Sequence, residues 1–105
     1  MKISKMKDGE NLYVSIEGAL DITTSPQLKA SLEEDLDSVK NVFFDLRGTD
    51  YTSSSGLRVL LGAFQTLEKK GGRMVLKNVN QSFLDILEMT GFTDFIEIDN
   101  SEGAV

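Results

Sequence analysis

A short, near-continuous apolar run, Val42-Phe43-Phe44-Asp45-Leu46, is the feature that most constrains the fold of this chain. Such a run is expected of a central parallel strand that is covered on both faces. Parallel strands need a long crossover connection, which is usually a helix. The run therefore predicts an α/β domain in which the neighbouring segments supply the helices.

The segments around that run have the periodicities that such a fold requires. Residues 1–6 alternate weakly and residues 12–17 clearly, with an Asp8-Gly9 turn between them, which predicts an antiparallel hairpin. One helix is predicted to begin at Ser25-Pro26, with Ser25 as its N-cap, and a second to end at Gly71-Gly72. Their apolar stripes consist of Leu28, Leu32, Leu36 and Val39 in the first helix, and of Leu57, Leu60, Leu61, Phe64 and Leu67 in the second.

The remaining segments complete a β-β-α-β-α-β-α-β order. Residues 74–76 and 95–98 read as strands, and a short helix capped by Ser82 is predicted to stop near Gly91. This order predicts one domain over residues 1–105, with a mixed, mostly parallel sheet and an N-terminal antiparallel hairpin. Because ligands and partners of such sheets use the carboxyl ends of the strands, the loop after Leu46 is the expected site.

The composition removes most catalytic and metal-binding chemistry. The 105 residues include no histidine and no cysteine, so the chain lacks the commonest general base, a thiol nucleophile and zinc-finger ligands. Its formal net charge of −6 argues against a nucleic-acid partner. No run approaches the roughly 18 apolar residues of a membrane helix, and no signal peptide opens the sequence. We expect a cytoplasmic domain with no cofactor, no bound metal and no membrane insertion.

Hydroxyl side chains are concentrated just before the second predicted helix, in Tyr51-Thr52-Ser53-Ser54-Ser55-Gly56-Leu57. One interpretation is helix capping, because serine and threonine oxygens accept hydrogen bonds from the free N–H groups of a first turn. Three consecutive serines are more than a cap requires. The other interpretation is phosphorylation, since a helix N-terminus stabilises an anion and a phosphate adds about −1.5 to −2 charges.

Four segments, in this order, resemble the motifs of STAS domains, and in particular those of single-domain bacterial anti-sigma factor antagonists. The resemblance runs from about residue 3 to residue 98, and the four motifs at these separations are far more specific than any one of them. They are Gly18-Ala19-Leu20-Asp21, Val42-Phe43-Phe44-Asp45-Leu46, the segment from Tyr51 to Leu57, and Phe83 through Leu87 to Gly91-Phe92. The resemblance implies a STAS-like sheet with about three to four helices.

The resemblance further implies partner switching. An unphosphorylated family member binds an anti-sigma factor that is also a serine kinase, and so frees the sigma factor. The kinase phosphorylates a serine at the start of the second helix, which ends the interaction, and a metal-dependent serine phosphatase restores it. ATP and magnesium belong to the kinase in that scheme, so the chain itself is not expected to be an enzyme.

Matching on the family's glycine assigns the implied roles to residues. The phosphoacceptor falls at Ser54, with Ser53 where family members commonly carry an aspartate, so Ser55 and Ser53 remain alternative acceptors. Asp21 matches the family's aspartate near the partner surface, but a turn or capping aspartate is an equal interpretation. The implied partner-binding residues are Asp21, Ser53, Ser54, Ser55, Gly56 and Leu57.

Two other functions compete with the switch. One is a STAS protein without phosphorylation, serving as a subunit of a transporter or another signalling assembly. The other is a carboxylate enzyme, in which Asp21, Asp45 and Asp50 converge at one sheet edge and hold magnesium. Acidic loop residues are normally just solvated, however, and the sequence offers no general base with an evident partner.

Three smaller expectations concern the surface and the C-terminus. The acidic run from Glu33 to Asp37 is a solvated helix face or, alternatively, a docking surface for a basic partner. Met74 and Met89 are predicted to fill the core. Only residues 100–105 follow the last predicted strand, so the final helix of many relatives is a single frayed turn or is missing, which would leave an apolar patch for a partner.

Overall fold

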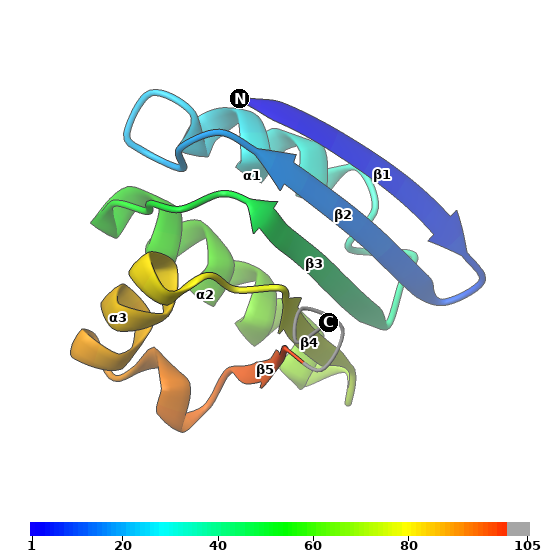
Figure 1. Ribbon diagram of the computed structural model, residues 1–105. Coiled ribbons are helices and arrows are strands. Elements are labelled where there is room, and N and C mark those ends of the chain that lie inside the picture. Colours follow the sequence, from blue (N-terminus) through cyan, green and yellow to red (C-terminus); the bar gives the residue numbers. More distant parts are fainter. Residues whose placement is uncertain (101–105) are drawn as a thin grey trace.

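The computed structural model describes residues 1–100, and its order of strands and helices confirms the predicted one (Figure 1). Five strands form one sheet in the order β1-β2-β3-β4-β5, in which β1 and β2 are antiparallel and all other neighbours are parallel. A short 3₁₀ helix, η1, adds to the predicted elements. The elements are β1 (Lys2–Asp8), β2 (Asn11–Glu17), α1 (Ser25–Glu33), β3 (Asn41–Gly48), α2 (Ser54–Lys69), β4 (Arg73–Lys77), α3 (Gln81–Met89), η1 (Phe92–Asp94) and β5 (Glu97–Asp99).

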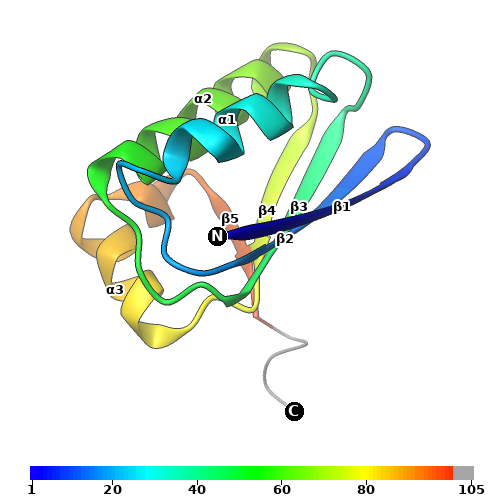
Figure 2. The same cartoon turned by 90° about the horizontal axis from the view of Figure 1, so that it is seen from above.

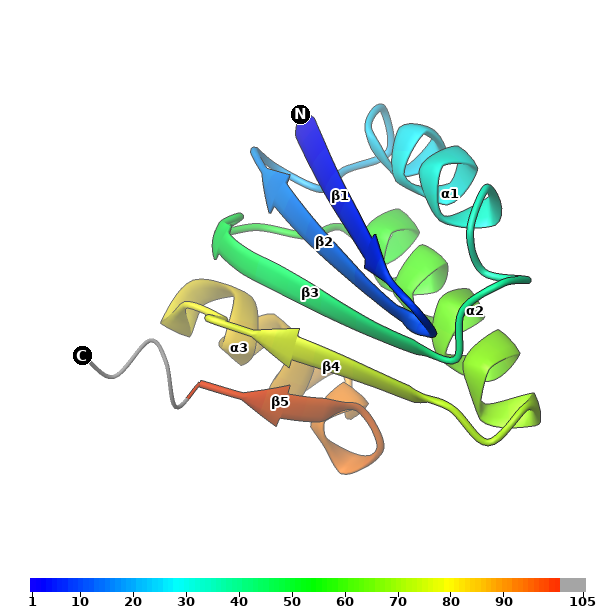
Figure 3. The same ribbon diagram turned by 90° about the vertical axis from the view of Figure 1, so that its right-hand side faces the viewer.

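The three α-helices cover one face of the sheet and leave the other face open (Figure 2 and Figure 3). The side chains of β3 alternate accordingly: Val42, Phe44 and Leu46 are buried, whereas Phe43 and Asp45 are only partly buried. The expectation that this strand is covered on both faces is therefore wrong. On the open face, the only apolar side chain of the run is Phe43. It packs on Tyr13 of the neighbouring strand β2 and is not covered by a helix.

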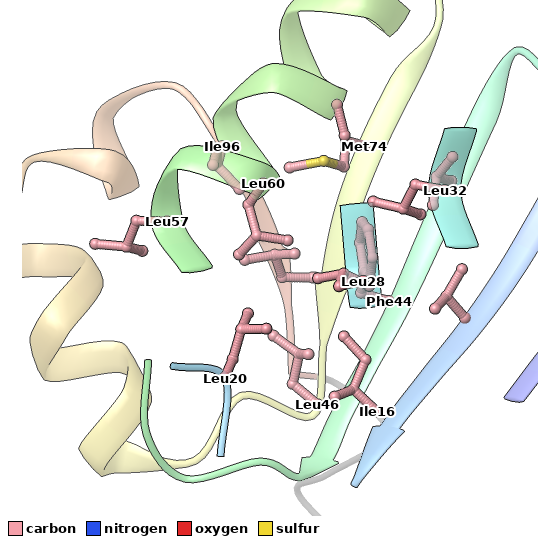
Figure 4. Packing of buried hydrophobic residues seen from close by; sticks show 14 of the residues in the cluster. Ile16, Leu20, Leu28, Leu32, Phe44, Leu46, Leu57, Leu60, Met74 and Ile96 are labelled. Carbon is pink, nitrogen blue, oxygen red and sulfur yellow. The ribbon is translucent and has the colours of Figure 1, made fainter. Parts of the chain in front are cut away.

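One hydrophobic core lies between the sheet and the helices (Figure 4). Strand residues such as Ile16 and Leu46 meet Leu28 of α1 and Leu60 of α2, and each of these side chains is at most 1% exposed. Burying one such side chain stabilises the fold by about 1.5–3 kcal/mol. Because this core holds β2 and β3 against α1 and α2, it also fixes the loops that join each strand to its helix.

α1 is shorter than the predicted stripe and begins differently. It ends at Glu33, and Leu36 follows in a turn and Val39 in the irregular segment after it, although Val39 is still buried at 2% exposure. Thr24 occupies the N-cap position, so the prediction of Ser25 as the cap is wrong. The Ser25 hydroxyl instead donates a hydrogen bond to the carbonyl oxygen of Asp21. The apolar spacing thus continues past the end of the helix, because it indicates which residues are buried and not which residues are helical.

The ends of α2 and α3 follow simple local chemistry. Gly71 has φ +74° after α2, as predicted for a helix that stops at glycine. At Gly72, a Cβ atom would collide with the carbonyl oxygen of Lys40. α3 is capped by Asn80, whose side-chain oxygen accepts a hydrogen bond from the Phe83 amide at 3.0 Å, so the prediction of Ser82 as the cap is wrong.

The C-terminal part differs from the prediction in two details. Met74 fills the core at 2% exposure, but Met89 is 85% exposed. Met89 ends α3 two residues after Leu87 and therefore leaves the core face of that helix. The last strand begins at Glu97, because the amides of Phe95 and Ile96 donate hydrogen bonds to the carbonyl oxygen of Phe92 in a turn that follows η1. The expectation about a final helix concerns residues 100–105, and all of these except Asn100 lie outside the described residues.

Candidate functional site

Two loops at the carboxyl ends of β2 and β3 are joined into one surface. The Leu20 amide donates to the Tyr51 carbonyl oxygen at 3.1 Å, and the Ser53 amide donates to the Leu20 carbonyl oxygen at 2.9 Å. These bonds form an isolated parallel bridge between Leu20 and Thr52. Leu20 is 0% exposed, so the bridge is anchored in the core. The loop that carries Asp21 and the loop that carries the serines are consequently held together.

Gly56 lies where α2 packs on that bridge. A Cβ atom at this position would lie 2.6 Å from Leu20 Cγ and closer still to Thr52 Oγ1. No larger residue fits without moving these groups, so glycine lets the first turn of α2 sit against both loops. Leu57 follows, with 6% exposure, as the first core residue of the helix. Two of the implied partner-binding residues, Gly56 and Leu57, therefore build the site from beneath.

The three serines at the start of α2 have different environments. Ser53 occupies the N-cap position, but its hydroxyl is buried and makes no capping hydrogen bond. Ser54 is the first residue of the helix and is exposed, whereas Ser55 is half-buried. The capping interpretation therefore fails for Ser53, the one serine at the N-cap position. Ser54 is the hydroxyl that a macromolecule reaches most easily.

The electrostatics of the helix start favour an anion at Ser54. α2 is 16 residues long, and its first amides have no acceptor within the helix. Together with the helix dipole, such amides stabilise negative charge at the N-terminus by about 0.3–1 kcal/mol. A phosphate on Ser54 would therefore be tolerated by the helix on which it stands.

Asp21 holds its own loop in shape. Its Oδ1 accepts hydrogen bonds from the Thr23 hydroxyl at 2.7 Å, from the Thr23 amide at 2.9 Å and from the Thr24 amide at 3.1 Å. These bonds, above all the one from the Thr23 hydroxyl, lower the pKa of Asp21 below its ordinary value. The carboxylate is only partly buried. A turn-forming role is thus visible, and the same group remains accessible beside the serine loop.

Asp21, Asp45 and Asp50 do not form a metal-binding group within the described residues. Asp45 lies on the open face, where its Oδ1 accepts hydrogen bonds from the Arg47 amide at 3.0 Å and from Asn78 Nδ2 at 3.1 Å. Asp50 is exposed in the serine loop. Within residues 1–100, no three acidic side chains are grouped so that they could hold a metal ion. The predicted convergence of Asp21, Asp45 and Asp50 is therefore wrong.

A groove that the sequence analysis missed adjoins the serines. It has a volume of about 610 Å³, runs between α1 and α2, and is lined by Ser55 at the end nearest the loops. Apolar residues of both helices line it, among them Pro26 and Val59, and so does Leu36 just after α1. Ile22, from the Asp21 loop, also lines it and is 73% exposed. The available signal was the helical spacing of side chains beside the two core stripes, together with Leu32 and Leu36 of the first stripe.

The acidic run after α1 is partly neutralised. Lys5 of β1 forms salt bridges to Glu34 at 2.6 Å and to Asp35 at 2.8 Å, and these bridges raise the pKa of Lys5. This arrangement ties the edge strand to the end of α1 and argues against the docking interpretation of the run. None of the helices in the described part of the chain has the length and apolar character needed to cross a membrane.

The fold and the site together define a one-sided α/β domain that presents a hydroxyl-bearing helix start at the carboxyl edge of its sheet. The chain belongs to the STAS domain family, whose model matches residues 2–105. The resemblance noted from the four sequence motifs is thereby confirmed.

Individual relatives are similar over almost the whole chain. The anti-sigma-B factor antagonist of Listeria monocytogenes is 33% identical over 102 residues, which are 94% of this chain and 88% of the relative. The anti-sigma-B factor antagonist of Bacillus subtilis is 31% identical over 102 residues, with 95% and 94% covered. The phosphorylated form of SpoIIAA, a Bacillus cell fate determinant, aligns with a TM-score of 0.75 and 21% identity, covering 98% of this chain and 96% of that one. The last likeness establishes the fold alone.

Proposed function

We propose that this chain is an anti-sigma factor antagonist that works by partner switching. Its unphosphorylated form binds an anti-sigma factor, which is also a serine kinase, and thereby releases the sigma factor. Phosphorylation at the start of α2 ends the interaction, and a serine phosphatase restores it. The observation that carries the proposal is the exposed Ser54 at that helix start, in a chain whose relatives are named anti-sigma factor antagonists.

The different environments of the serines favour Ser54 as the phosphoacceptor. A kinase must bring the serine oxygen to the γ-phosphate of ATP, so the hydroxyl has to be accessible. Ser54 is exposed, whereas Ser55 is half-buried and the hydroxyl oxygen of Ser53 is buried. Ser55 is the first alternative, because it is only half-buried, and Ser53 is the second, because its hydroxyl oxygen is buried.

The switch follows from the charge that phosphorylation adds to the contact surface at the start of α2. Phosphorylation brings about −1.5 to −2 charges and three acceptor oxygens. The helix N-terminus accommodates that charge, so the fold survives, as the phosphorylated form of SpoIIAA with the same fold illustrates. A partner packed over Ser54 would have to desolvate the phosphate, and the complex would dissociate.

Asp21 completes the partner-binding surface in this proposal. The Leu20–Thr52 bridge holds its loop next to Ser54, and the low pKa keeps the carboxylate ionised at neutral pH. A basic group of the partner can therefore pair with it. Leu57 and Gly56 contribute by supporting the first turn of α2, and Ser53 and Ser55 flank the acceptor.

In the proposed role, the chain regulates its partner by binding to it and does not act as an enzyme. In this scheme ATP and magnesium are bound by the kinase, and the chain needs neither a cofactor nor a metal ion of its own. Its place of action is the cytoplasm, where a sigma factor meets RNA polymerase. The acidic net charge of −6 agrees with a protein partner and not with nucleic acid.

Incubation with the purified cognate anti-sigma factor, ATP and magnesium tests the proposal. Intact-mass measurement is expected to show one phosphoryl group on the wild-type chain and none on Ser54→Ala. An unchanged wild-type mass would contradict the proposal, as would equal labelling of Ser54→Ala. Stable co-purification with a membrane ATPase complex, without phosphorylation, would favour the non-switching transporter subunit instead.

A further inference from the structure

We propose that the groove between α1 and α2 receives one amphipathic helix of the anti-sigma factor, with apolar side chains in the groove and carboxylates along its edges. The inference rests on the proposed function and names a second part of the same contact surface. Ser55 lines the groove and directly follows Ser54, so one partner can cover the phosphoacceptor and fill the groove together.

The shape of the groove fits a helix. α1 and α2 lie side by side (Figure 2), and the residues that line the groove recur along each of them at helical spacing. On α2 these are positions 55, 58, 59, 62, 63 and 66, and on α1 they are positions 25, 26, 29, 32 and 33, with positions 22 and 36 lining the groove just before and just after α1. Each helix therefore contributes side chains that recur three and four residues apart along the groove. A helix that presents anchors three and four residues apart is the ligand that recognises such a surface.

Gly62, in the middle of α2, has no explanation within the chain. A Cβ atom at this position would meet nothing within 4 Å, so no internal contact requires a glycine. Glycine inside a helix is nevertheless less stable than alanine. Gly62 lines the groove, and the missing side chain lets an external backbone come close to α2. The position is thus open to a partner instead of being filled by the protein itself.

The apolar part of the groove is available for contact. Ile22 is 73% exposed and overhangs the end near the serines, and Val59 is only partly buried. A partner helix that covered both side chains would remove a continuous apolar strip from water. Such burial is the main source of affinity in helix-in-groove binding.

The charges of the groove select an acidic partner segment. Lys29 and Arg58 line its two sides, and neither forms a salt bridge within residues 1–100. One carboxylate, Glu33, also lines it. The groove therefore carries a local excess of positive charge on a chain whose net charge is −6. Carboxylates on the partner helix would pair with these two cations at the rim of the contact.

Substitution of Gly62 tests the groove without disturbing the fold. Gly62→Gln places a long side chain in the groove, and the open space around the Cβ position predicts a melting temperature at or above that of the wild type. Affinity for the purified cognate anti-sigma factor, measured by calorimetry, is expected to fall about tenfold or more. The matched control is Ala30→Gln, at an exposed position of α1 that does not line the groove, which is expected to bind like the wild type.

The outcomes separate this inference from the proposed function. If the wild type binds and is phosphorylated at Ser54 while Gly62→Gln binds equally well, the groove proposal is wrong and the function stands. If the wild type neither binds the anti-sigma factor nor is phosphorylated, both are wrong. Arg58→Glu is expected to weaken binding about fivefold to tenfold, and a gain in affinity would overturn the acidic partner segment.

A photo-crosslinking residue at position 59 identifies the occupant directly. With the purified anti-sigma factor, we expect the cross-linked peptide to come from a helix that carries apolar residues at three- and four-residue spacing and at least one carboxylate. Cross-linking to a loop or to a basic segment would contradict the proposal. The same crosslinker at position 13, on the open face of the sheet, is expected to give no adduct.

Discussion

Two of the surfaces that expose apolar side chains, the open face of the sheet and the α1–α2 groove, differ in how their exposed side chains are partnered. On the open face, Tyr13 stacks on Phe43 with ring centroids 5.2 Å apart, and Lys77 Nζ lies 5.9 Å from the centre of the Phe43 ring. In the groove, Ile22 is 73% exposed, and the nearby Arg58 forms no salt bridge with a described residue. The exposed ring of Tyr13 is thus engaged by another side chain of the molecule, whereas the groove presents an exposed isoleucine and a cation without a salt bridge to a described residue.

The same contrast holds between neighbouring residues of one loop. Leu20 is 0% exposed and joins the two loops, while Ile22, two residues later, is 73% exposed and lines the groove. Leu20 supports the surface from the core, whereas Ile22 is exposed on that surface. The same substitution should therefore lower mainly the stability at Leu20 and mainly the affinity for a partner at Ile22.

The largest effect is expected for Leu20→Ala, which should destabilise the fold by about 2–5 kcal/mol because it empties a fully buried site. Ile22→Ala, the matched control, should change stability by less than about 0.5 kcal/mol. Urea denaturation measures both. The binding readout should distinguish them as well, since Ile22→Ala is expected to weaken the complex with the anti-sigma factor. Equal destabilisation by the two substitutions would break the comparison.

Gly56→Ala is expected to destabilise the chain by about 1–3 kcal/mol, because its methyl group collides with Leu20 and Thr52. Gly62→Ala, in the same helix, should stabilise it by about 0.5–1 kcal/mol, since the new methyl group meets open space. Thermal unfolding of the two variants compares two glycines that differ only in what surrounds them. Stabilisation by Gly56→Ala would show that the loops are not packed as described.

Tyr13→Ala examines the open face. Loss of the stacked ring should cost about 0.5–1.5 kcal/mol of stability. Affinity for the anti-sigma factor should stay unchanged, because the open face is not part of the proposed contact surface. Calorimetric titration checks the second statement, and a clear loss of affinity with an intact fold would move the interface to the other side of the sheet.

The smallest effect concerns pH. The pKa of Asp21 is lower in the folded chain than its ordinary value of about 3.9, so its hydrogen bonds contribute stability above that value. This contribution is lost as the pH falls through the lower, folded pKa. The difference in melting temperature between the wild type and Asp21→Asn is therefore expected to be constant from about pH 7 to pH 5 and to shrink below pH 4. A difference that stayed constant at acid pH would assign Asp21 no role as an ionised acceptor.

Much of the fold could be predicted because each element has a local signature. Burial is indicated directly by the alternation before Glu17 and by the apolar run that ends at Leu46. Backbone conformation is indicated by the glycines after α2. The predictions that were wrong depended on which face of an element is covered. The sequence predicts Phe43 as a core residue, but no helix covers its face of the sheet. It also predicts Met89 as a core residue, although Met89 is the last residue of α3 and is exposed.

The candidate site could be predicted in position but not in its internal geometry. The serine cluster marks the start of α2, and the strand order places that start at the carboxyl edge of the sheet. Which serine is exposed depends on the Leu20–Thr52 bridge, a contact between residues 32 positions apart that no local pattern encodes. The groove depends on the separation of two helices, so its residues become a set only in three dimensions.

The most direct measurement compares one protein in its two states. The chain phosphorylated by its cognate kinase and the unphosphorylated chain are titrated with the same anti-sigma factor in a calorimeter, after circular dichroism has shown that both are folded. We expect phosphorylation at Ser54 to weaken binding by about a hundredfold, since a desolvated phosphate costs several kcal/mol at such an interface. Equal affinity of the two forms would contradict the account.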